Sequence, residues 1–240
     1  MPHHPHRFVS AQLAGFAVAM ALVVGCTPAE KLGAIDVRNT AGRSGAYYIP
    51  AGPRDHALPL LVVLHSTGAS GEGVLDWFRA LARERRFAII APESGLAPGG
   101  QISWEVGDRP GAVTQDLEHV LACVRWVREH TDLKVDAARV LIAGHSGGGS
   151  SAPYIASNRP FFTHIAVLHG GVFPGGIGPR RMPVWLSTGD GDRVRPPALV
   201  RKAADAMERL GFPVTFEVLP GTHGPSEAEL QALVRWWLGQ

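Results

Sequence analysis

The residues of this 240-residue chain that most clearly could carry out a reaction form the sequence Gly-His-Ser-Gly-Gly at positions 144–148. This G-x-S-x-G pattern directly follows an apolar run at 139–143 and precedes a stretch of small residues. Between a strand and a helix, the pattern is typical of a nucleophilic serine held in a sharp turn. The glycines on either side leave room for that turn, and the start of the helix offers N–H groups to a developing oxyanion. The pattern therefore indicates acyl transfer through Ser146.

A serine hydroxyl is a weak nucleophile that needs a general base, and the base needs an acid to orient it. In a strand–turn–helix arrangement, the acid and then the histidine follow the serine along the chain. Asp192 follows an apolar segment at 182–187, and His223 follows another at 215–219. Each interval is long enough for a strand and a helix, so the three loops can meet at one edge of a sheet. We expect Ser146, Asp192 and His223 to form a catalytic triad.

For the acid and for the histidine of this triad, the sequence also contains alternative residues. Asp190 lies two residues before Asp192 and is the alternative acid, and the carboxylate that is not used should bind a turn amide of the same loop. Five other histidines of the mature chain lie on a predicted helix, in the serine turn or at the ends of a predicted strand: His119, His130, His145, His164 and His169. His223 is the one in the loop after the last predicted strand.

These loops resemble those of the α/β-hydrolase family. The pattern G-x-x-D-x-V-x-P at 189–196 is similar to the family's acid loop, and Gly-Thr-His at 221–223 is similar to its histidine loop. The resemblance extends from about residue 46 to the C-terminus. It implies an α/β-hydrolase fold with a mostly parallel eight-stranded sheet, one antiparallel edge strand, helices on both faces and a minimal cap. The serine turn and the long interval after Trp104 are most similar to secreted polyhydroxybutyrate-depolymerase-like and feruloyl-esterase-like enzymes.

Acyl transfer also needs two N–H donors for the oxyanion. One donor is expected to be the backbone N–H of Gly147, directly after the nucleophile. The loop at 64–71 resembles the family's His-Gly-x pattern, which implies that the Thr67 N–H is the second donor. Ser66 stands where that pattern has glycine. If this position requires a positive φ, a serine there is strained by about 1 kcal/mol or more.

Three side chains are expected near the substrate. Trp104 lies in a Gly/Pro-rich loop after a predicted strand and is a candidate wall for an acyl or aryl group, although it could equally cover the core. His145 lies inside the serine turn, and Phe173 lies in the short loop that replaces a cap domain. Because that loop is short, we expect an open pocket.

Strands and helices alternate along the rest of the chain. Apolar or β-branched runs predict strands at 46–49, 60–65, 88–92, 139–143, 164–168, 184–187 and 215–219, with a weaker candidate at 34–37. Amphipathic stretches predict helices at 74–86, 113–130, 149–157, 197–210 and 226–238. In the last of these, Ser226 and Glu229 have the spacing of a capping box. The alternation predicts one α/β domain at 46–240, preceded by a linker and possible edge strand at 26–45.

The first 25 residues are expected to be an export signal. Arg7 precedes an apolar run at 13–24, which has the length of a signal-peptide core and is too short to span a bilayer. The following Val-Val-Gly-Cys resembles a bacterial lipobox, which implies that Cys26 is acylated and becomes the mature N-terminus. The alternative is plain secretion. We therefore expect a lipid-anchored protein of the bacterial cell envelope that meets the membrane only through Cys26.

Composition narrows the remaining function classes. Lys and Arg number 23 against 21 Asp and Glu, a balance that gives no electrostatic footprint for nucleic acid. We find no metal-ligand spacing of Cys and His, so no metal or other cofactor is expected. The sequence thus predicts a serine esterase acting on a small-molecule or polymeric ester. A peptidase or thioesterase on the same triad, or an inactive surface-binding lipoprotein, remains the alternative.

Overall fold

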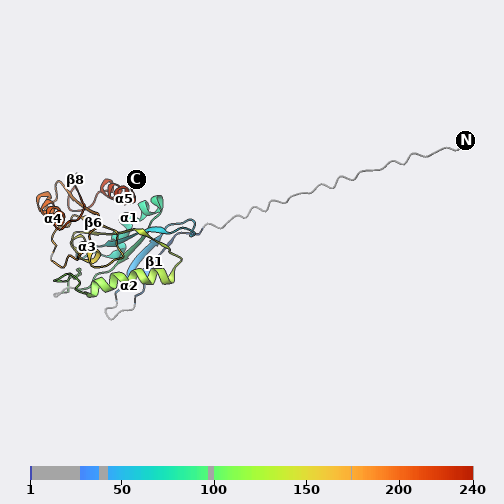
Figure 1. The fold of residues 1–240 in the computed structure, drawn as a ribbon, viewed down its shortest axis with the longest axis horizontal. Coiled ribbons are helices and arrows are strands. Elements are labelled where there is room, and N and C mark those ends of the chain that lie inside the picture. The colour runs from blue at the N-terminus through green and yellow to red at the C-terminus, as the bar shows by residue number, and fades with distance from the viewer. Residues whose placement is uncertain (2–27, 38–42, 97–99, 174, 240) are drawn as a thin grey trace.

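The structure is a computed structural model that describes Met1 and residues 28–37, 43–96, 100–173 and 175–239 (Figure 1). Eight strands form a single sheet in the order β1-β2-β4-β3-β5-β6-β7-β8. The elements are β1 Lys31–Ile35, β2 Gly45–Ile49, β3 Leu58–Leu64, α1 Gly71–Arg85, β4 Ala88–Pro92, α2 Gln115–His130, β5 Val135–His145, α3 Gly147–Ser157, β6 His164–Leu168, β7 Val184–Gly189, α4 Pro197–Arg209, β8 Val214–Leu219 and α5 Glu227–Leu238. The predicted mostly parallel α/β sheet is confirmed.

The one antiparallel strand is not at the edge, and in this detail the prediction was wrong. β2 runs antiparallel to both of its neighbours, β1 and β4. The pairs from β4 across to β8 are all parallel. β1, which lies at 31–35 and not at 34–37, adds a further strand outside β2 and so becomes the edge of the sheet.

The central strands are buried on both faces, which explains their continuous apolar sequences. All seven residues of β3 are buried, and they alternate between two cores. Leu60 and Val62 point into the core under α2, α3 and α4, whereas Leu61 and Val63 point into the core under α1 and α5. This period of two places helices on both faces and leaves the loops at the carboxyl ends of the strands to carry the site.

Helices α1, α2 and α5 begin at side-chain caps that the sequence contains, whereas α3 and α4 have no side-chain cap. The hydroxyls of Ser70, Thr114 and Ser226 each accept a hydrogen bond from the N–H three residues later. The capping box predicted for the last helix is only half formed. Ser226 Oγ accepts from the Glu229 N–H at 3.2 Å, but the Glu229 carboxylate is buried and meets His169 instead of turning back to Ser226.

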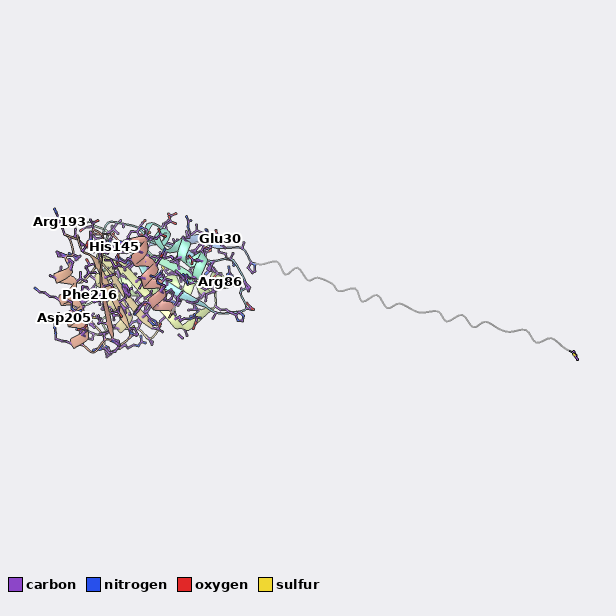
Figure 2. All side chains as sticks on the ribbon, turned by 90° about the horizontal axis from the view of Figure 1, so that it is seen from above. Glu30, Arg86, His145, Arg193, Asp205 and Phe216 are labelled. Carbon is purple, nitrogen blue, oxygen red and sulfur yellow. The ribbon has the colours of Figure 1, made fainter. Side chains whose placement is uncertain are left out.

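Within the part of the chain described above, no helix has both the length and the apolar character needed to cross a membrane. The apolar run at 13–24 and the predicted acylation site at Cys26 lie outside the described residues. The described stretch that leads into β1 starts at Pro28, whose carbonyl accepts a hydrogen bond from the Gly52 N–H at 2.9 Å. Figure 2 shows Glu30 and Arg86 toward this end of the molecule, and His145 and Arg193 toward the other.

Candidate active site

Ser146 occupies a sharp turn between β5 and α3. Its backbone has φ 51° and ψ −110°, a conformation that costs a non-glycine residue about 1–3 kcal/mol. Close backbone packing requires the glycines around it. A Cβ on Gly144 would lie 2.3 Å from the Gly148 carbonyl carbon, and a Cβ on Gly148 would lie 2.5 Å from the His65 oxygen. The sequence pattern thus predicts the local geometry for the steric reason given above.

The structure brings Ser146, His223 and Asp192 together from three loops at the carboxyl ends of β5, β8 and β7. The Ser146 hydroxyl donates to His223 Nε2 at 3.0 Å, and His223 Nδ1 donates to Asp192 Oδ2 at 2.8 Å. Ser146 and His223 are partly exposed, whereas Asp192 is buried. In this arrangement the His223 imidazole can take the proton of Ser146 as the serine oxygen attacks a carbonyl carbon.

Asp192 is held as a carboxylate by its surroundings. Burial alone would raise its pKa, but hydrogen bonds from the Arg195 N–H, His223, His169 and the Val194 N–H hold the pKa well below its usual range. The two backbone donors bind Oδ1 at 2.7 and 2.8 Å. Ionised Asp192 is therefore available to orient His223.

Asp190, the alternative acid, binds the backbone of the loop that carries His223. Asp190 Oδ1 accepts a hydrogen bond from the Gly221 N–H at 3.1 Å, two residues before His223. The chain therefore uses the two carboxylates of this loop differently. Asp192 contacts the imidazole, and Asp190 fixes the backbone that carries it.

Two polar residues that the sequence did not assign to the site lie behind Asp192. His169 Nδ1 is 2.8 Å from Asp192 Oδ2, and His169 Nε2 is 3.2 Å from Glu229 Oε2. Both His169 and Glu229 are buried, and His169 has φ 50°. One signal was available for Glu229, because it lies on the same face of α5 as the buried residues Leu233 and Trp237.

His145 lies beside His223, and neither of its ring nitrogens has a hydrogen-bond partner among the described residues. Its ring is 5.1 Å from that of His223 and 5.7 Å from that of His169, with Trp77 of α1 at 5.2 Å on its edge. Burial, followed by the charges of His223 and His169, lowers the pKa of His145 to about 4. His145 is therefore a neutral group next to the imidazole of His223, and its contact with substrate remains a prediction.

The two predicted oxyanion donors belong to adjacent residues in space. A Cβ built on Gly147 would lie 2.4 Å from Thr67 Oγ1 and 3.4 Å from the Thr67 backbone nitrogen. Ser66 is not among the described non-glycine residues with positive φ, and the left-handed residue of this loop is Gly68, at φ 77°. The strain considered for Ser66 is therefore absent, because the positive φ of this loop falls on Gly68, two positions later.

Three hydrogen bonds to the loop after β4 hold this loop. The Trp104 indole N–H donates to the His65 carbonyl at 2.8 Å. His65 Nε2 accepts from the Ser94 N–H at 3.0 Å, which places the ring proton on Nδ1, where it faces the Ser66 carbonyl at 2.7 Å. The Gly68 N–H donates to the Ile102 carbonyl at 3.0 Å. The position of Thr67 thus depends on the loops after β3 and β4 together.

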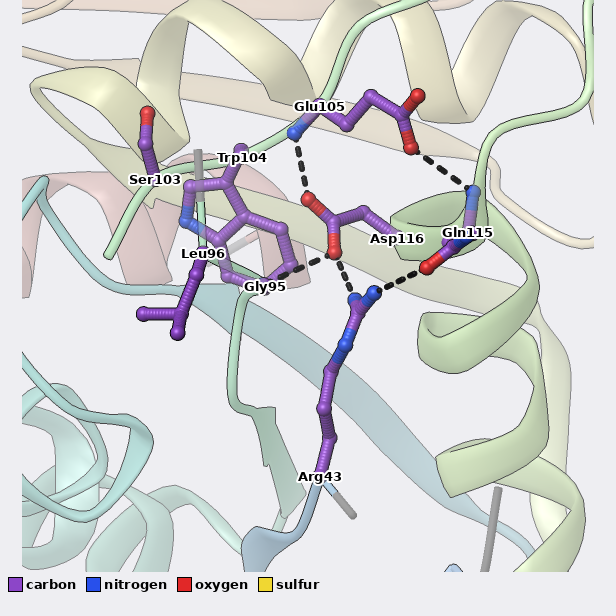
Figure 3. Close-up of a pocket in the computed structure, with 8 residues that line it drawn as sticks. All are labelled: Arg43, Gly95, Leu96, Ser103, Trp104, Glu105, Gln115 and Asp116. Carbon is purple, nitrogen blue, oxygen red and sulfur yellow. Dashed lines mark hydrogen bonds and ion pairs between the residues drawn. The ribbon is translucent and has the colours of Figure 1, made fainter. Parts of the chain in front are cut away.

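Trp104 is buried, with 7% of its surface exposed, and it contributes to the wall of a cavity of about 370 Å³ (Figure 3). In this cavity Asp116 pairs with Arg43 and accepts hydrogen bonds from the Gly95 and Glu105 N–H groups. Asp116 therefore fixes both ends of the loop that carries Trp104.

Neither this cavity nor a hollow of about 510 Å³ around Arg86 and Arg139 includes a residue of the proposed triad. The hydrogen-bond geometry, and not the size of these cavities, locates the site. Phe173 is half-buried and packs against the core under α2, α3 and α4. For Trp104 and Phe173, contact with substrate stays a prediction.

His169, Asp192 and His223 also place three potential metal ligands within 4.8 Å of one another. The Nδ1 atoms of both imidazoles, however, already meet the same Asp192 oxygen at hydrogen-bond distance. A cation at this point would displace both hydrogen bonds. We therefore assign the cluster to hydrogen bonding and not to metal binding.

The chain is similar in sequence to known proteins. A family model described as esterase PHB depolymerase matches residues 43–222, a range that includes Ser146 and Asp192 and ends one residue before His223. Lysophospholipase-like protein 1 of Mus musculus is 25% identical over 203 residues, which cover 74% of this chain and 85% of the mouse protein.

Two solved esterases have a similar fold. A carboxylesterase of Bacillus cereus superposes with a TM-score of 0.62 at 15% identity, covering 83% of this chain and 95% of that one. A hyperthermophilic esterase of the archaeon Pyrobaculum calidifontis superposes with a TM-score of 0.66 at 15% identity, covering 89% and 86%. Because the family model spans most of the chain, the resemblance deduced from the loops is confirmed: the chain belongs to the esterase PHB depolymerase family and is a carboxylic ester hydrolase with the α/β-hydrolase fold.

Proposed function

We propose that this esterase is a serine hydrolase in which Ser146, His223 and Asp192 are the catalytic triad. The observation that carries the proposal is the continuous hydrogen-bonded chain from Ser146 Oγ through His223 to Asp192 Oδ2, with links of 3.0 and 2.8 Å. The strained backbone of Ser146 supports it, because such strain clusters at functional sites.

In the first half of the reaction, Ser146 Oγ attacks the ester carbonyl carbon while its proton passes to His223 Nε2. The resulting oxyanion accepts hydrogen bonds from the N–H groups of Gly147 and Thr67. The carbon–oxygen bond to the alcohol then breaks, and the leaving oxygen takes the proton from His223 Nε2. Asp192 stabilises the intermediate imidazolium through Nδ1. The products of this half are a free alcohol and an acyl group on Ser146.

The second half repeats these steps with water. His223 Nε2 takes a proton from a water molecule as that oxygen attacks the acyl carbon. The oxyanion forms again between Gly147 and Thr67, and its collapse releases the acid. The proton on His223 returns to Ser146 Oγ. Every proton in the cycle is carried by water, substrate, Ser146 or His223, so the route requires no further group.

The test is turnover of a p-nitrophenyl acyl ester by Ser146→Ala. We expect a loss of at least about 10³-fold in kcat, as for other serine nucleophiles. The matched control is Ser150→Ala, one turn further along α3, which removes a buried hydroxyl from the same helix and leaves turnover near the wild-type rate. Turnover retained by Ser146→Ala would remove this residue from the mechanism.

We further propose that the chain is exported and held at the cell envelope by a lipid on Cys26. The signal-like apolar run and the Val-Val-Gly-Cys sequence support this proposal. Expression with a radiolabelled fatty acid tests it. The wild-type chain should carry the label and sediment with membranes, whereas Cys26→Ser should carry none. An unlabelled wild-type chain in the soluble fraction would contradict the anchor.

A further inference from the structure

A buried imidazole lies between two buried carboxylates behind the triad. His169 follows β6, Asp192 follows β7, and Glu229 lies in the first turn of α5. Their exposed fractions are 0%, 2% and 1%. His169 Nδ1 lies 2.8 Å from Asp192 Oδ2, and Nε2 lies 3.2 Å from Glu229 Oε2. The hydrogen-bonded chain from Ser146 thus continues beyond Asp192 to Glu229.

The two contacts determine the charge of the ring. A neutral imidazole has one N–H, so it would offer a lone pair to one of the two carboxylates. An imidazolium has an N–H for each, and it also neutralises part of a negative charge that would be costly to bury. We propose that His169 is held as an imidazolium by Asp192 and Glu229, and that it is a positioning residue whose charge sets the pH range over which the triad works.

The environment of the ring supports this assignment. Burial alone would lower the pKa of His169, but the hydrogen bonds to Glu229 and Asp192 outweigh burial, and the pKa lies above its ordinary value. The other titratable rings that face it are His145 and His223, at 5.7 Å each. His145 is neutral above about pH 4, so it adds no positive charge beside His169 in the neutral range.

The backbone fixes the ring in place. The His169 N–H donates to the Ser187 carbonyl at 2.8 Å, and the preceding residue, Leu168, accepts from the Ser146 N–H at 2.9 Å. His169 therefore directly follows the last residue of β6, which is hydrogen-bonded to the backbone of Ser146. Its φ of 50° is unfavourable for a side chain, and such positions persist where the surroundings fix them.

The consequence for catalysis follows from the shared oxygen. Asp192 Oδ2 receives hydrogen bonds from His169 and from His223. A positive charge on His169 withdraws electron density from Asp192, so the carboxylate stabilises the imidazolium of His223 less strongly. The free-base form of the triad then persists to lower pH. This effect rests on the proposed function, whereas the charge of His169 does not.

The direct test of the charge is side-chain ¹⁵N NMR of histidine-labelled wild-type protein between pH 7 and 8. We expect one histidine with both ring nitrogens protonated throughout this range. Its signal should be absent from His169→Asn, which removes the ring; asparagine is chosen because it tolerates positive φ. A His169 signal with one unprotonated nitrogen would overturn the proposal. This measurement needs no turnover, so its outcome is independent of the role of Ser146.

The second test is the pH profile of kcat/KM in Glu229→Gln, which keeps the shape of the side chain and removes its charge. Without Glu229 the proton leaves His169, and the acid limb should move up by about 1 pH unit, the size of an effect from a neighbouring charge. The matched control, Glu227→Gln, removes the same charge from an exposed position in the same turn and should leave the limb in place. An unmoved or lowered limb in folded Glu229→Gln would contradict the proposal.

Discussion

The indole of Trp104 donates its N–H to the carbonyl oxygen of His65 at 2.8 Å, and the two rings lie 5.0 Å apart. This contact joins the loop after β4 to the loop after β3, which carries the proposed oxyanion donor Thr67. The sequence suggested Trp104 as a wall for substrate, but in the structure its polar atom is directed at the backbone beside the site. An indole buried in this way usually has such a partner.

Trp104→Phe tests this connection. The change keeps an aromatic ring and leaves the buried His65 carbonyl without its indole donor, at a cost of about 1–3 kcal/mol in the free energy of unfolding. Because Thr67 lies two residues away, kcat should fall more than KM rises. Urea unfolding and steady-state kinetics measure the two effects. Trp126→Phe, on the outer part of α2, is the control and should change neither kcat nor KM. Equal kcat values for Trp104→Phe and wild type would show that the indole hydrogen bond does not position the loop that carries Thr67.

Gly148→Ala should damage both fold and activity. The added Cβ would meet the oxygens of His65 and Leu64 at 2.5 Å, and backbone atoms on both sides leave it little freedom to move. We expect a loss of about 1–3 kcal/mol in stability from overpacking, together with a displaced serine turn and lower kcat. Gly224→Ala is the matched control in the histidine loop, because a Cβ there meets nothing within 4 Å. Wild-type stability and activity in Gly148→Ala would show that the turn does not need this glycine.

The depressed pKa of His145 makes stability depend on pH. The unfolded residue binds a proton near its ordinary pKa of 6.5, whereas the folded residue binds one only near 4. Its contribution is therefore complete above pH 6.5 and is lost as the pH falls toward 4. Between pH 7 and 5 wild type should lose about 2 kcal/mol relative to His145→Gln. Urea unfolding of both proteins at the two pH values measures the difference.

His56→Gln is the control for this pH effect. The His56 side chain is 87% exposed, so its replacement should leave the pH dependence of stability as in wild type. A constant stability difference between wild type and His145→Gln from pH 7 to pH 5 would contradict the neutral, buried state of His145.

The elements of the fold were predictable because local sequence determines them. β4 and β6 have the predicted bounds, since each is an apolar run bounded by residues that end a strand. The extension of β5 back to Val135 was not predictable, because it depends on pairing with Leu58, far away in the sequence. The order of β1 and β2 at the edge was missed for the same reason.

Some residues of the site could likewise be predicted from local sequence, and others could not. The positions of Ser146, Asp192 and His223 could be predicted because each occupies a loop with its own local pattern. The pairing of His169 with Glu229 could not be predicted, because it joins residues 60 positions apart and the Ser226–Glu229 spacing suggested a capping box. Asp116 was likewise hidden within an amphipathic helix, although its carboxylate holds Arg43 and the ends of the Trp104 loop.

The central claim, that Ser146 is the nucleophile, is tested most directly by reaction with a fluorophosphonate followed by mass spectrometry of the peptides. A serine activated by His223 should gain one phosphonyl group, and fragmentation should place that group on Ser146. The modification should disappear in His223→Ala, which removes the base while keeping the hydroxyl. Labelling of a different residue, or no labelling of a protein that still hydrolyses esters, would contradict the proposed triad.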